Sequence, residues 1–233
     1  LTKIGRAGYL KGFREGVKEN LLEGLQLAQE CKDRKTEALA HNYLGLFLRR
    51  FASPQEALKH FESAYAIYQE MNHLPGMANT LLNMGIAYAH LGNMEKDMEV
   101  NQKALQIAED TGDLYVIASA TQNIGVILMD MQGKAREALP YLKKGWEIHQ
   151  AMGALLPQVI DLRNLGECYM LLGEIGQAHR SLQESLKLAR EIHSPFHILD
   201  TQHSISELYL YSGLFAEAEN LLKQIWKESQ TPG

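Results

Sequence analysis

The chain has 233 residues and a formal net charge of −5, from 23 Lys and Arg and 28 Asp and Glu residues. This balance lacks the broad basic field that nonspecific nucleic-acid binding requires, so we expect no direct nucleic-acid partner. No apolar run approaches the roughly 20 residues that cross a bilayer, and no signal peptide is present, so we expect a soluble protein without a membrane partner. Two cysteines, Cys31 and Cys168, fit reduced thiols in a cytosolic protein better than a disulfide framework.

A small-residue helix signature recurs along the whole chain at intervals of 40, 40, 40, 41 and 40 residues; its anchor positions are Gly5, Gly45, Gly85, Gly125, Gly166 and Ser206. A fixed period of this size predicts a solenoid, in which each unit packs on its neighbours instead of on one central core. We therefore expect one array over 1–233, with repeats at 1–33, 34–73, 74–113, 114–153, 154–194 and 195–230. The chain starts at Leu1, without methionine and close to the first signature. We expect a truncated first repeat and an excised segment of a longer protein.

Each repeat is predicted to hold two antiparallel helices of about 17 residues, which makes the fold all-α with twelve helices. In the third repeat, Leu81, Met84 and Tyr88 share one face of the first helix, and Gly92-Asn93 breaks it. The second helix runs from about Met94 to Asp110. Similar breaks are predicted within repeats at Ser53-Pro54, Gln132-Gly133-Lys134, Gly173-Glu174 and Ser212-Gly213, and between repeats at Thr111-Gly112-Asp113, Leu74-Pro75-Gly76, Met152-Gly153 and Ser194-Pro195.

The recurring small residues predict close contacts between the two helices of a pair. Large partners fill the space beside them, including Phe61, Leu142 and Leu182. The spacing from Gly125 to its partner alanine is one residue longer than elsewhere, which places an insertion in the turn near 131–134. Asp97 and Asn101 depart from the apolar pattern. Asp97 lies in the first turn of its helix, where the helix dipole favours an anion; the alternatives are a weakened joint or a polar patch on the outer surface.

These patterns resemble the tetratricopeptide repeat family in its long, roughly 40-residue form. The matching residues are the pairs Leu44-Gly45, Met84-Gly85, Ile124-Gly125 and Leu165-Gly166, the following Tyr or Leu, and the alanines of the second helices. Similar arrays occur in kinesin light chains, spindle-orientation scaffolds, peptide-sensing bacterial regulators, and the sensor arms of transcription factors and signalling enzymes. The resemblance implies a right-handed α-solenoid of six helix pairs, whose inner groove is lined by the first helices and binds a peptide or protein segment. By analogy, it also suggests a bacterial, cytoplasmic protein.

Helix geometry at about 100° per residue turns the positions three before and one, four and five after each anchor away from the packed face. Leu46, Ile86, Val126 and Met129 would then form a continuous apolar patch, which on a soluble protein marks a contact site. The alternative is burial against the neighbouring repeat. The predicted groove residues are Asn42, Leu46, Arg49, Arg50, Leu82, Asn83, Ile86, His90, Gln122, Asn123, Val126, Met129, Arg163, Asn164, Glu167 and Met170.

Asparagines recur two residues before the anchor, at Asn83, Asn123 and Asn164. An amide carries both donors and acceptors, so such a ladder can bond an extended backbone without reading its side chains. In related repeat proteins such asparagines often hold a bound peptide. The alternative is that they bond the adjacent helix or follow the repeat consensus.

Charge is unevenly distributed along the predicted groove. Lys3, Arg6, Arg49 and Arg50 lie at the first end, and Asp130, Glu167 and Glu207 lie toward the last. A ligand that presents acidic residues to the first two repeats and apolar residues to the middle would fit this pattern. The alternative is solvated charge on an open face.

The sequence contains none of the common catalytic or cofactor motifs. There is no HExxH or CxxC, no phosphate-binding loop, no dinucleotide fingerprint and no GxSxG elbow. We therefore expect no enzyme activity, no cofactor and no metal. The leading prediction is an interaction scaffold. The alternatives are a sensory module that responds to a peptide or small ligand, and self-association through the last helix, where Ile225 and Trp226 have no following helix to cover them.

Overall fold

The fold is seen in a computed structural model that describes residues 16–131 and 133–229. These residues form eleven helices and no strand: α2 (Val17–Glu30), α3 (Arg34–Phe51), α4 (Pro54–Glu70), α5 (Leu74–His90), α6 (Met94–Thr111), α7 (Leu114–Asp130), α8 (Ala135–Ala151), α9 (Leu155–Leu171), α10 (Ile175–Glu191), α11 (Pro195–Tyr211) and α12 (Phe215–Ser229). Over the described residues, the all-α prediction is confirmed, and consecutive helix pairs pack as in a tetratricopeptide solenoid. The predicted opening helix, with Gly5, lies outside these residues.

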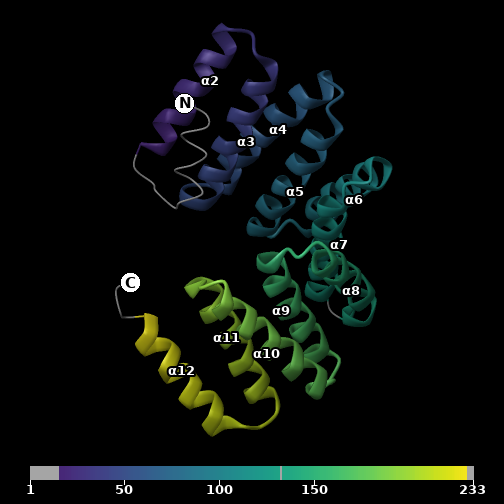
Figure 1. Cartoon of the computed structure of the whole chain (residues 1–233), viewed down its shortest axis with the longest axis vertical. Coiled ribbons are helices and arrows are strands. Elements are labelled where there is room, and N and C mark those ends of the chain that lie inside the picture. The colour runs from purple at the N-terminus through teal and green to yellow at the C-terminus, as the bar shows by residue number, and fades with distance from the viewer. Residues whose placement is uncertain (1–15, 132, 230–233) are drawn as a thin grey trace. The chain divides into compact units, whose positions relative to one another are not determined.

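The chain divides into two compact units, residues 1–120 and 121–233, with the boundary inside α7. In the first unit, α2 packs on α3, α3 on α4, α4 on α5 and α5 on α6. In the second unit, α8 to α12 follow the same order, each packing on the next (Figure 1). Short turns make consecutive helices antiparallel, so α3 and α5 in unit 1, and α9 and α11 in unit 2, are first helices of successive pairs.

Helix starts are specified locally by caps and prolines. Asp33 and Asn93 accept hydrogen bonds from the third backbone N–H of α3 and α6, at 3.1 Å each. The predicted break at Leu74-Pro75-Gly76 is placed too late, because α5 begins at Leu74. The predicted break at Ser194-Pro195 holds the N-cap Ser194 and the first residue of α11. Proline is tolerated in the first helical turn, where its missing N–H would have no helical partner, so it marks the start of the helix and not the gap before it.

Turns between pairs share one backbone conformation. Lys32, Asn72 and His193 have φ near +50°, and Gly112 and Gly153 occupy the corresponding positions. A residue in the left-handed conformation ends the helix by redirecting the chain. Glycine adopts this conformation without steric strain because it has no Cβ. Within pairs, the turn 131–134 has four positions, one more than 91–93, 172–174 and 212–214, as the predicted insertion requires.

The anchor glycines lie where the two helices of a pair meet. A Cβ added to Gly45 would stand 2.4 Å from Cε1 of Phe61, and one added to Gly166 would stand 2.6 Å from Cγ of Leu182. Gly125 meets Leu142 in the same way, at 2.6 Å from Cδ2. The predicted close approach is therefore confirmed at these pairs, and the missing side chain makes room for a buried large residue.

Asp97 and Asn101 are buried beside the anchor Gly85. The amide Nδ2 of Asn101 donates to Oδ1 of Asp97 at 2.6 Å and to the Asp97 carbonyl at 2.9 Å, and a Cβ on Gly85 would meet that amide at 2.5 Å. Asn101 takes the position that Phe61, Leu142 or Leu182 occupies elsewhere, and Asp97 takes that of Ala57 one repeat earlier. The hydrogen bonds within the pair compensate for its burial. The predicted alternative of an outer polar patch is wrong, because Asn101 is fully buried.

Candidate functional site

The predicted groove residues all lie on first helices, four on each of α3, α5, α7 and α9. Leu46 and Ile86 belong to unit 1, and Val126 and Met129 belong to unit 2; all four side chains are partly exposed. Each unit therefore carries two of the four residues of the predicted apolar patch. A continuous patch through all four residues stays a prediction.

Burial divides the predicted residues into two groups. Arg50 and His90 are exposed, and Arg49, Asn83, Asn123, Arg163 and Glu167 are partly exposed. Asn42, Leu82, Gln122, Asn164 and Met170 are buried. Asn42 donates from Nδ2 to Oγ1 of Thr80 at 2.8 Å, and Gln122 donates from Nε2 to the Leu142 carbonyl at 2.7 Å. These two amides therefore bond neighbouring helices.

Unit 1 contains a hollow of ≈ 350 Å³ between α3 and α5. Its rim combines apolar and amide side chains from the two helices, and Tyr68 of α4 and His73 of the α4–α5 turn also contribute. The lining residues are Leu39, Asn42, Tyr43, Leu46, Tyr68, His73, Pro75, Gly76, Asn79 and Asn83. Three of these, Asn42, Leu46 and Asn83, were predicted from the sequence. The hollow thus lies on the first-helix face where a groove is expected.

The polar side chains that line the hollow differ in the hydrogen bonds that they make. Asn79 donates from Nδ2 to the Pro75 carbonyl at 2.8 Å, and the Nδ1 of His73 accepts from the Gly76 N–H at 2.9 Å. Burial raises the pKa of Tyr68, and a hydrogen bond with Asn42 opposes this rise. The amide of Asn83 makes no hydrogen bond within the described part of the chain. Its donors and acceptor remain available to a ligand.

Three rim residues, Leu39, Tyr43 and Asn79, were not among the predicted groove residues. Leu39 and Asn79 lie six positions before the anchors Gly45 and Gly85, and Tyr43 lies two positions before Gly45. They extend the predicted set of groove residues by one helical turn toward the N-terminus of each first helix. The spacing Leu39, Tyr43, Leu46 repeats as Asn79, Asn83, Ile86. This i, i+4, i+7 pattern is the signal that could have identified them.

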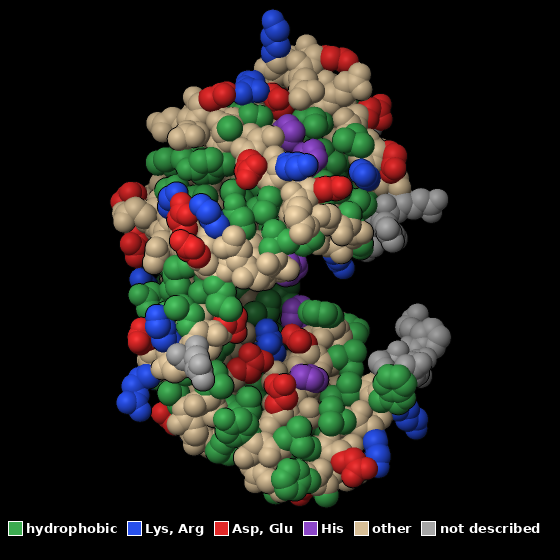
Figure 2. Space-filling view, turned by 180° about the vertical axis from the view of Figure 1, so that it is seen from behind, with side chains coloured by type: hydrophobic (Ala, Val, Ile, Leu, Met, Phe, Trp, Pro, Cys, Tyr) green, Lys and Arg blue, Asp and Glu red, His purple; other side chains and the backbone are tan. Residues whose placement is uncertain are grey.

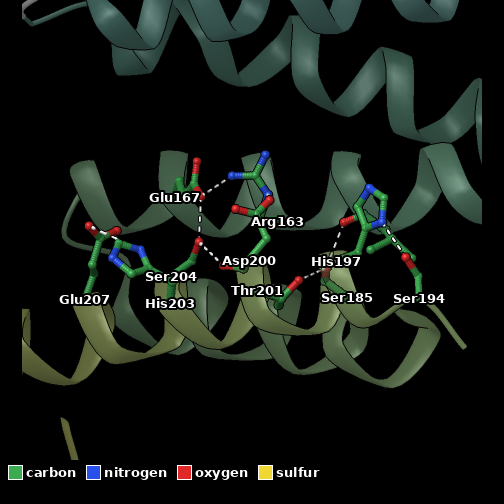
Figure 3. A network of polar contacts seen from close by, with 11 residues as sticks. Arg163, Glu167, Ser185, Ser194, His197, Asp200, Thr201, His203, Ser204 and Glu207 are labelled. Carbon is green, nitrogen blue, oxygen red and sulfur yellow. Dashed lines mark hydrogen bonds and ion pairs between the residues drawn. The ribbon is translucent and has the colours of Figure 1, made fainter. Parts of the chain in front are cut away.

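Unit 2 carries a polar network between α9 and α11 (Figure 3). The Arg163 guanidinium contacts Glu167 at 2.7 Å and Asp200 at 3.1 Å, and the Ser204 hydroxyl donates to Glu167 at 2.7 Å. Arg163 and Glu167, both predicted as ligand contacts, therefore pair with each other and link the two first helices. Because one guanidinium faces two carboxylates, this surface favours a cation over an anion.

Histidines border this network on α11. His203 lies 3.8 Å from Glu207, both exposed, and His197 shares a 2.7 Å hydrogen bond with the Ser194 hydroxyl. Burial, with a smaller contribution from Arg163, lowers the pKa of His197, and Asp200 opposes the shift. His197 is therefore predominantly neutral at pH 7. No group of three or more metal-ligating side chains occurs in the described ranges.

The predicted charge gradient has its two ends in different units. In unit 1, Arg50 places its guanidinium 5.1 Å from the ring centre of Phe51 on α3, while Lys3 and Arg6 lie outside the described residues. In unit 2, burial raises the pKa of Asp130. Acidic and basic side chains are intermingled over the face shown in Figure 2. A ligand orientation set by the gradient stays a prediction.

A tetratricopeptide repeat family model matches residues 35–110 and 159–225, more than half of the chain. The chain belongs to the tetratricopeptide repeat family. The predicted family is thus confirmed on both units of this tetratricopeptide array, and the matching model does not indicate a catalytic family.

Two curated relatives match part of the tetratricopeptide array. The mitochondrial homolog of tetratricopeptide repeat protein 19 from Drosophila melanogaster is 26% identical over an alignment of 161 residues, and the match covers 63% of this chain and 43% of the relative. The transcriptional activator NprA from Geobacillus stearothermophilus is 27% identical over 154 residues, or 66% of this chain and 37% of the relative. The matches span less than half the length of either relative.

Solved structures share the fold of the array. BtubC (BKLC) from P. vanneervenii superposes with a TM-score of 0.75 at 16% identity, covering 93% of this chain and 92% of that chain. A Rap protein, solved in complex with competence and sporulation factor, superposes with a TM-score of 0.70 at 18% identity, covering 82% and 54%. Among the residues described, no helix is long and apolar enough to cross a membrane.

Proposed function

We propose that this chain is a non-catalytic, cytoplasmic scaffold that binds an extended peptide or protein segment along its first-helix face. The observation that carries the proposal is the hollow of unit 1, where the amide of Asn83 stands beside the apolar rim residues Leu46 and Leu39. An extended backbone offers both N–H and C=O groups, which one asparagine amide can bond together. A neighbouring apolar side chain of the ligand would enter the hollow between α3 and α5.

The test begins with peptides selected from a random 12-residue display library on the immobilised chain, measured by fluorescence anisotropy. Asn83→Ala removes the free amide and should weaken binding about fivefold, because a net hydrogen bond contributes about 1 kcal/mol. Leu46→Glu places a charge at the rim and should weaken binding by more than about tenfold. Gln102→Ala removes an exposed amide from α6, on a second helix, and serves as the matched control.

Circular dichroism should show unchanged helicity in all three variants. If Asn83→Ala and Leu46→Glu bind the selected peptides as the parent does, the ligand site is not the hollow of unit 1. If Gln102→Ala also loses binding, the second helices contribute and the first-helix proposal is wrong.

The basic residues Arg49 and Arg50 of α3 predict that an acidic part of the ligand binds at this end of the face. Replacing Arg49 and Arg50 together with Ala should weaken an acidic peptide several-fold at low salt and much less at high salt, because exposed charges are screened beyond about 10 Å at 0.1 M salt. Anisotropy titrations in 20 mM and 500 mM NaCl measure the difference. Equal affinity of variant and parent at both salt concentrations would exclude an acidic segment at this end.

A regulatory role is the second candidate, favoured by the partial match to a transcriptional activator. In this case the array would be the sensory part of a larger regulator, and a peptide or small ligand would change the relation between its repeats. Small-angle X-ray scattering with and without a selected peptide tests this version. A ligand-dependent change in radius of gyration supports sensing, and an unchanged profile at saturation supports a rigid scaffold.

A further inference from the structure

Two histidines face each other across the α3–α4 pair of unit 1. The Nδ1 atoms of His41 on α3 and His60 on α4 are 2.9 Å apart, and the ring centres are 5.2 Å apart with an interplanar angle of 41°. Both side chains are partly exposed, so the pair can be reached from solvent. Neither the proposed peptide site nor the family match accounts for this contact.

Packing alone does not require histidine at these positions. One repeat later, 40 residues along the chain, the corresponding residues of α5 and α6 are Leu81 and Val100, both buried. In the α5–α6 pair, these two positions are thus filled by aliphatic side chains. In the α3–α4 pair the same register instead brings together two nitrogen donors.

The separation of the two nitrogens matches one type of metal geometry. With imidazole–metal bonds of about 2.0–2.1 Å, ligands at 90° stand about 2.9 Å apart, and tetrahedral ligands stand about 3.3–3.4 Å apart. Square-planar or tetragonal coordination by nitrogen and oxygen is typical of Cu(II) and Ni(II), and Cu(II) is bound most strongly in the divalent series. We propose that His41 and His60 form a two-histidine site for such an ion, which links α3 to α4.

The hydrogen bond between the two histidines can be replaced by metal binding without a net loss of protons. In the metal-free contact, one Nδ1–H donates to the other Nδ1, so at most one ring carries its proton on Nδ1. Transfer of that proton to Nε2 of the same ring, with a small rotation of both rings, turns both Nδ1 lone pairs toward the ion. The His41–His60 bond is replaced by two metal–nitrogen bonds, and both rings stay neutral.

Water completes the coordination in this proposal. Glu37 and Glu56 each lie one turn before a histidine, on α3 and α4, but Glu37 is already paired with Arg34 at 2.6 Å. The described residues hold no group of three or more ligating side chains, so the proposal is confined to two protein ligands. Such a site is open and binds more weakly than a structural zinc site with four ligands.

Calorimetric titration of the untagged chain with CuCl2 and NiCl2 tests the proposal, together with electron paramagnetic resonance of the copper-loaded chain. We expect one saturable site, hyperfine coupling from two imidazole nitrogens, and a rise in the melting temperature with metal, because the ion binds only the folded pair. His41→Gln and His60→Gln should each weaken this site by roughly tenfold or more and abolish the two-nitrogen spectrum.

His179→Gln removes an exposed histidine from α10 and is the matched control. It should leave affinity, spectrum and melting shift unchanged, and circular dichroism of all three variants checks their helicity. A wild-type spectrum without two imidazole nitrogens overturns the proposal. So does a metal affinity in His41→Gln and His60→Gln equal to that of the parent, which would assign the bound ion to the other histidines.

Discussion

At the residue scale, the most constrained positions are those where a missing side chain makes room for a large neighbour. Gly45 faces the fully buried ring of Phe61, and Gly166 faces Leu182. Gly176 lies on the open side of α10, where an added Cβ would meet only the end of Arg180, at 3.9 Å. The same substitution should therefore have opposite effects at these two kinds of site.

Gly45→Ala should lower the free energy of unfolding by about 1–3 kcal/mol, because the new Cβ overlaps a ring that cannot move into solvent. Gly176→Ala should raise it by about 0.5–1 kcal/mol, because alanine reduces the entropy of the unfolded chain and forms helix better. Urea unfolding followed by circular dichroism measures both. A stabilising Gly45→Ala would contradict the close contact between α3 and α4.

The two cysteines differ in environment. Cys31 is exposed, whereas Cys168 is buried on α9 and contacts the Ala135 carbonyl at 3.3 Å. Burial raises the pKa of Cys168 to about 11, with Glu174 adding to the shift. Because the thiolate is the reactive form, Cys168 should be inert toward alkylating reagents near neutral pH.

In the native chain at pH 8, we expect iodoacetamide to modify Cys31 and to reach Cys168 only after unfolding. The folded-state pKa of Cys168 is raised, so its contribution to stability is full below the ordinary thiol value of 9.0 and is lost as the pH rises through about 11. Mass spectrometry of alkylated peptides measures the reactivity, and Cys168→Ser isolates its part of the alkaline stability loss. Equal labelling of both thiols at pH 8 would refute the burial of Cys168.

At the element scale, the turns between helix pairs repeat one left-handed residue. Gly153 adopts it with φ +66°, and His193, 40 residues later, adopts it with φ +51°. A non-glycine residue in this conformation costs about 1–2 kcal/mol, partly offset by the lower flexibility of its unfolded chain. The repeat therefore tolerates, at His193, a residue that the conformation does not favour.

His193→Gly should stabilise the chain by up to about 1 kcal/mol, and Gly153→Ala should destabilise it by about 1 kcal/mol, because each changes the strain at the same register position. Thermal unfolding by circular dichroism compares the two. If both variants unfold at the parent temperature, the left-handed turn does not limit stability.

At the scale of the whole molecule, the last helix pair, α11 and α12, carries a group of exposed large apolar residues. Phe215 is 68% exposed and Trp226 is 69% exposed, and they line one hollow with Leu210 and Leu222. In the preceding pair, the positions of α10 that correspond to Leu222 and Trp226 hold Leu182 and Leu186, which are buried. Self-association through α12 therefore stays a prediction with a definite surface.

Trp226→Glu should shift the chain toward the monomer if this surface joins two copies, because a charge replaces the largest exposed ring. Leu156→Glu, which places the same charge on an exposed apolar residue of α9, is the control. Sedimentation velocity over a hundredfold concentration range provides the measurement. A parent chain that is monomeric throughout would exclude self-association through α12.

The sequence by itself determined the all-α class, the repeat period, the family and the close contacts at Gly45, Gly125 and Gly166, because helical periodicity and small-residue spacing are local properties that recur. It also predicted Asn83 and Leu46 as groove residues from the anchor register, and both line the hollow of unit 1. Only the tertiary structure decided which of the predicted groove residues are buried. Asn42 and Gln122 are buried, and each donates a hydrogen bond to a neighbouring helix. The periodicity of the sequence does not indicate these partners, because they lie on other helices. The same holds for the contact of His41 with His60, which are 19 residues apart on antiparallel helices and meet only when α3 and α4 pack.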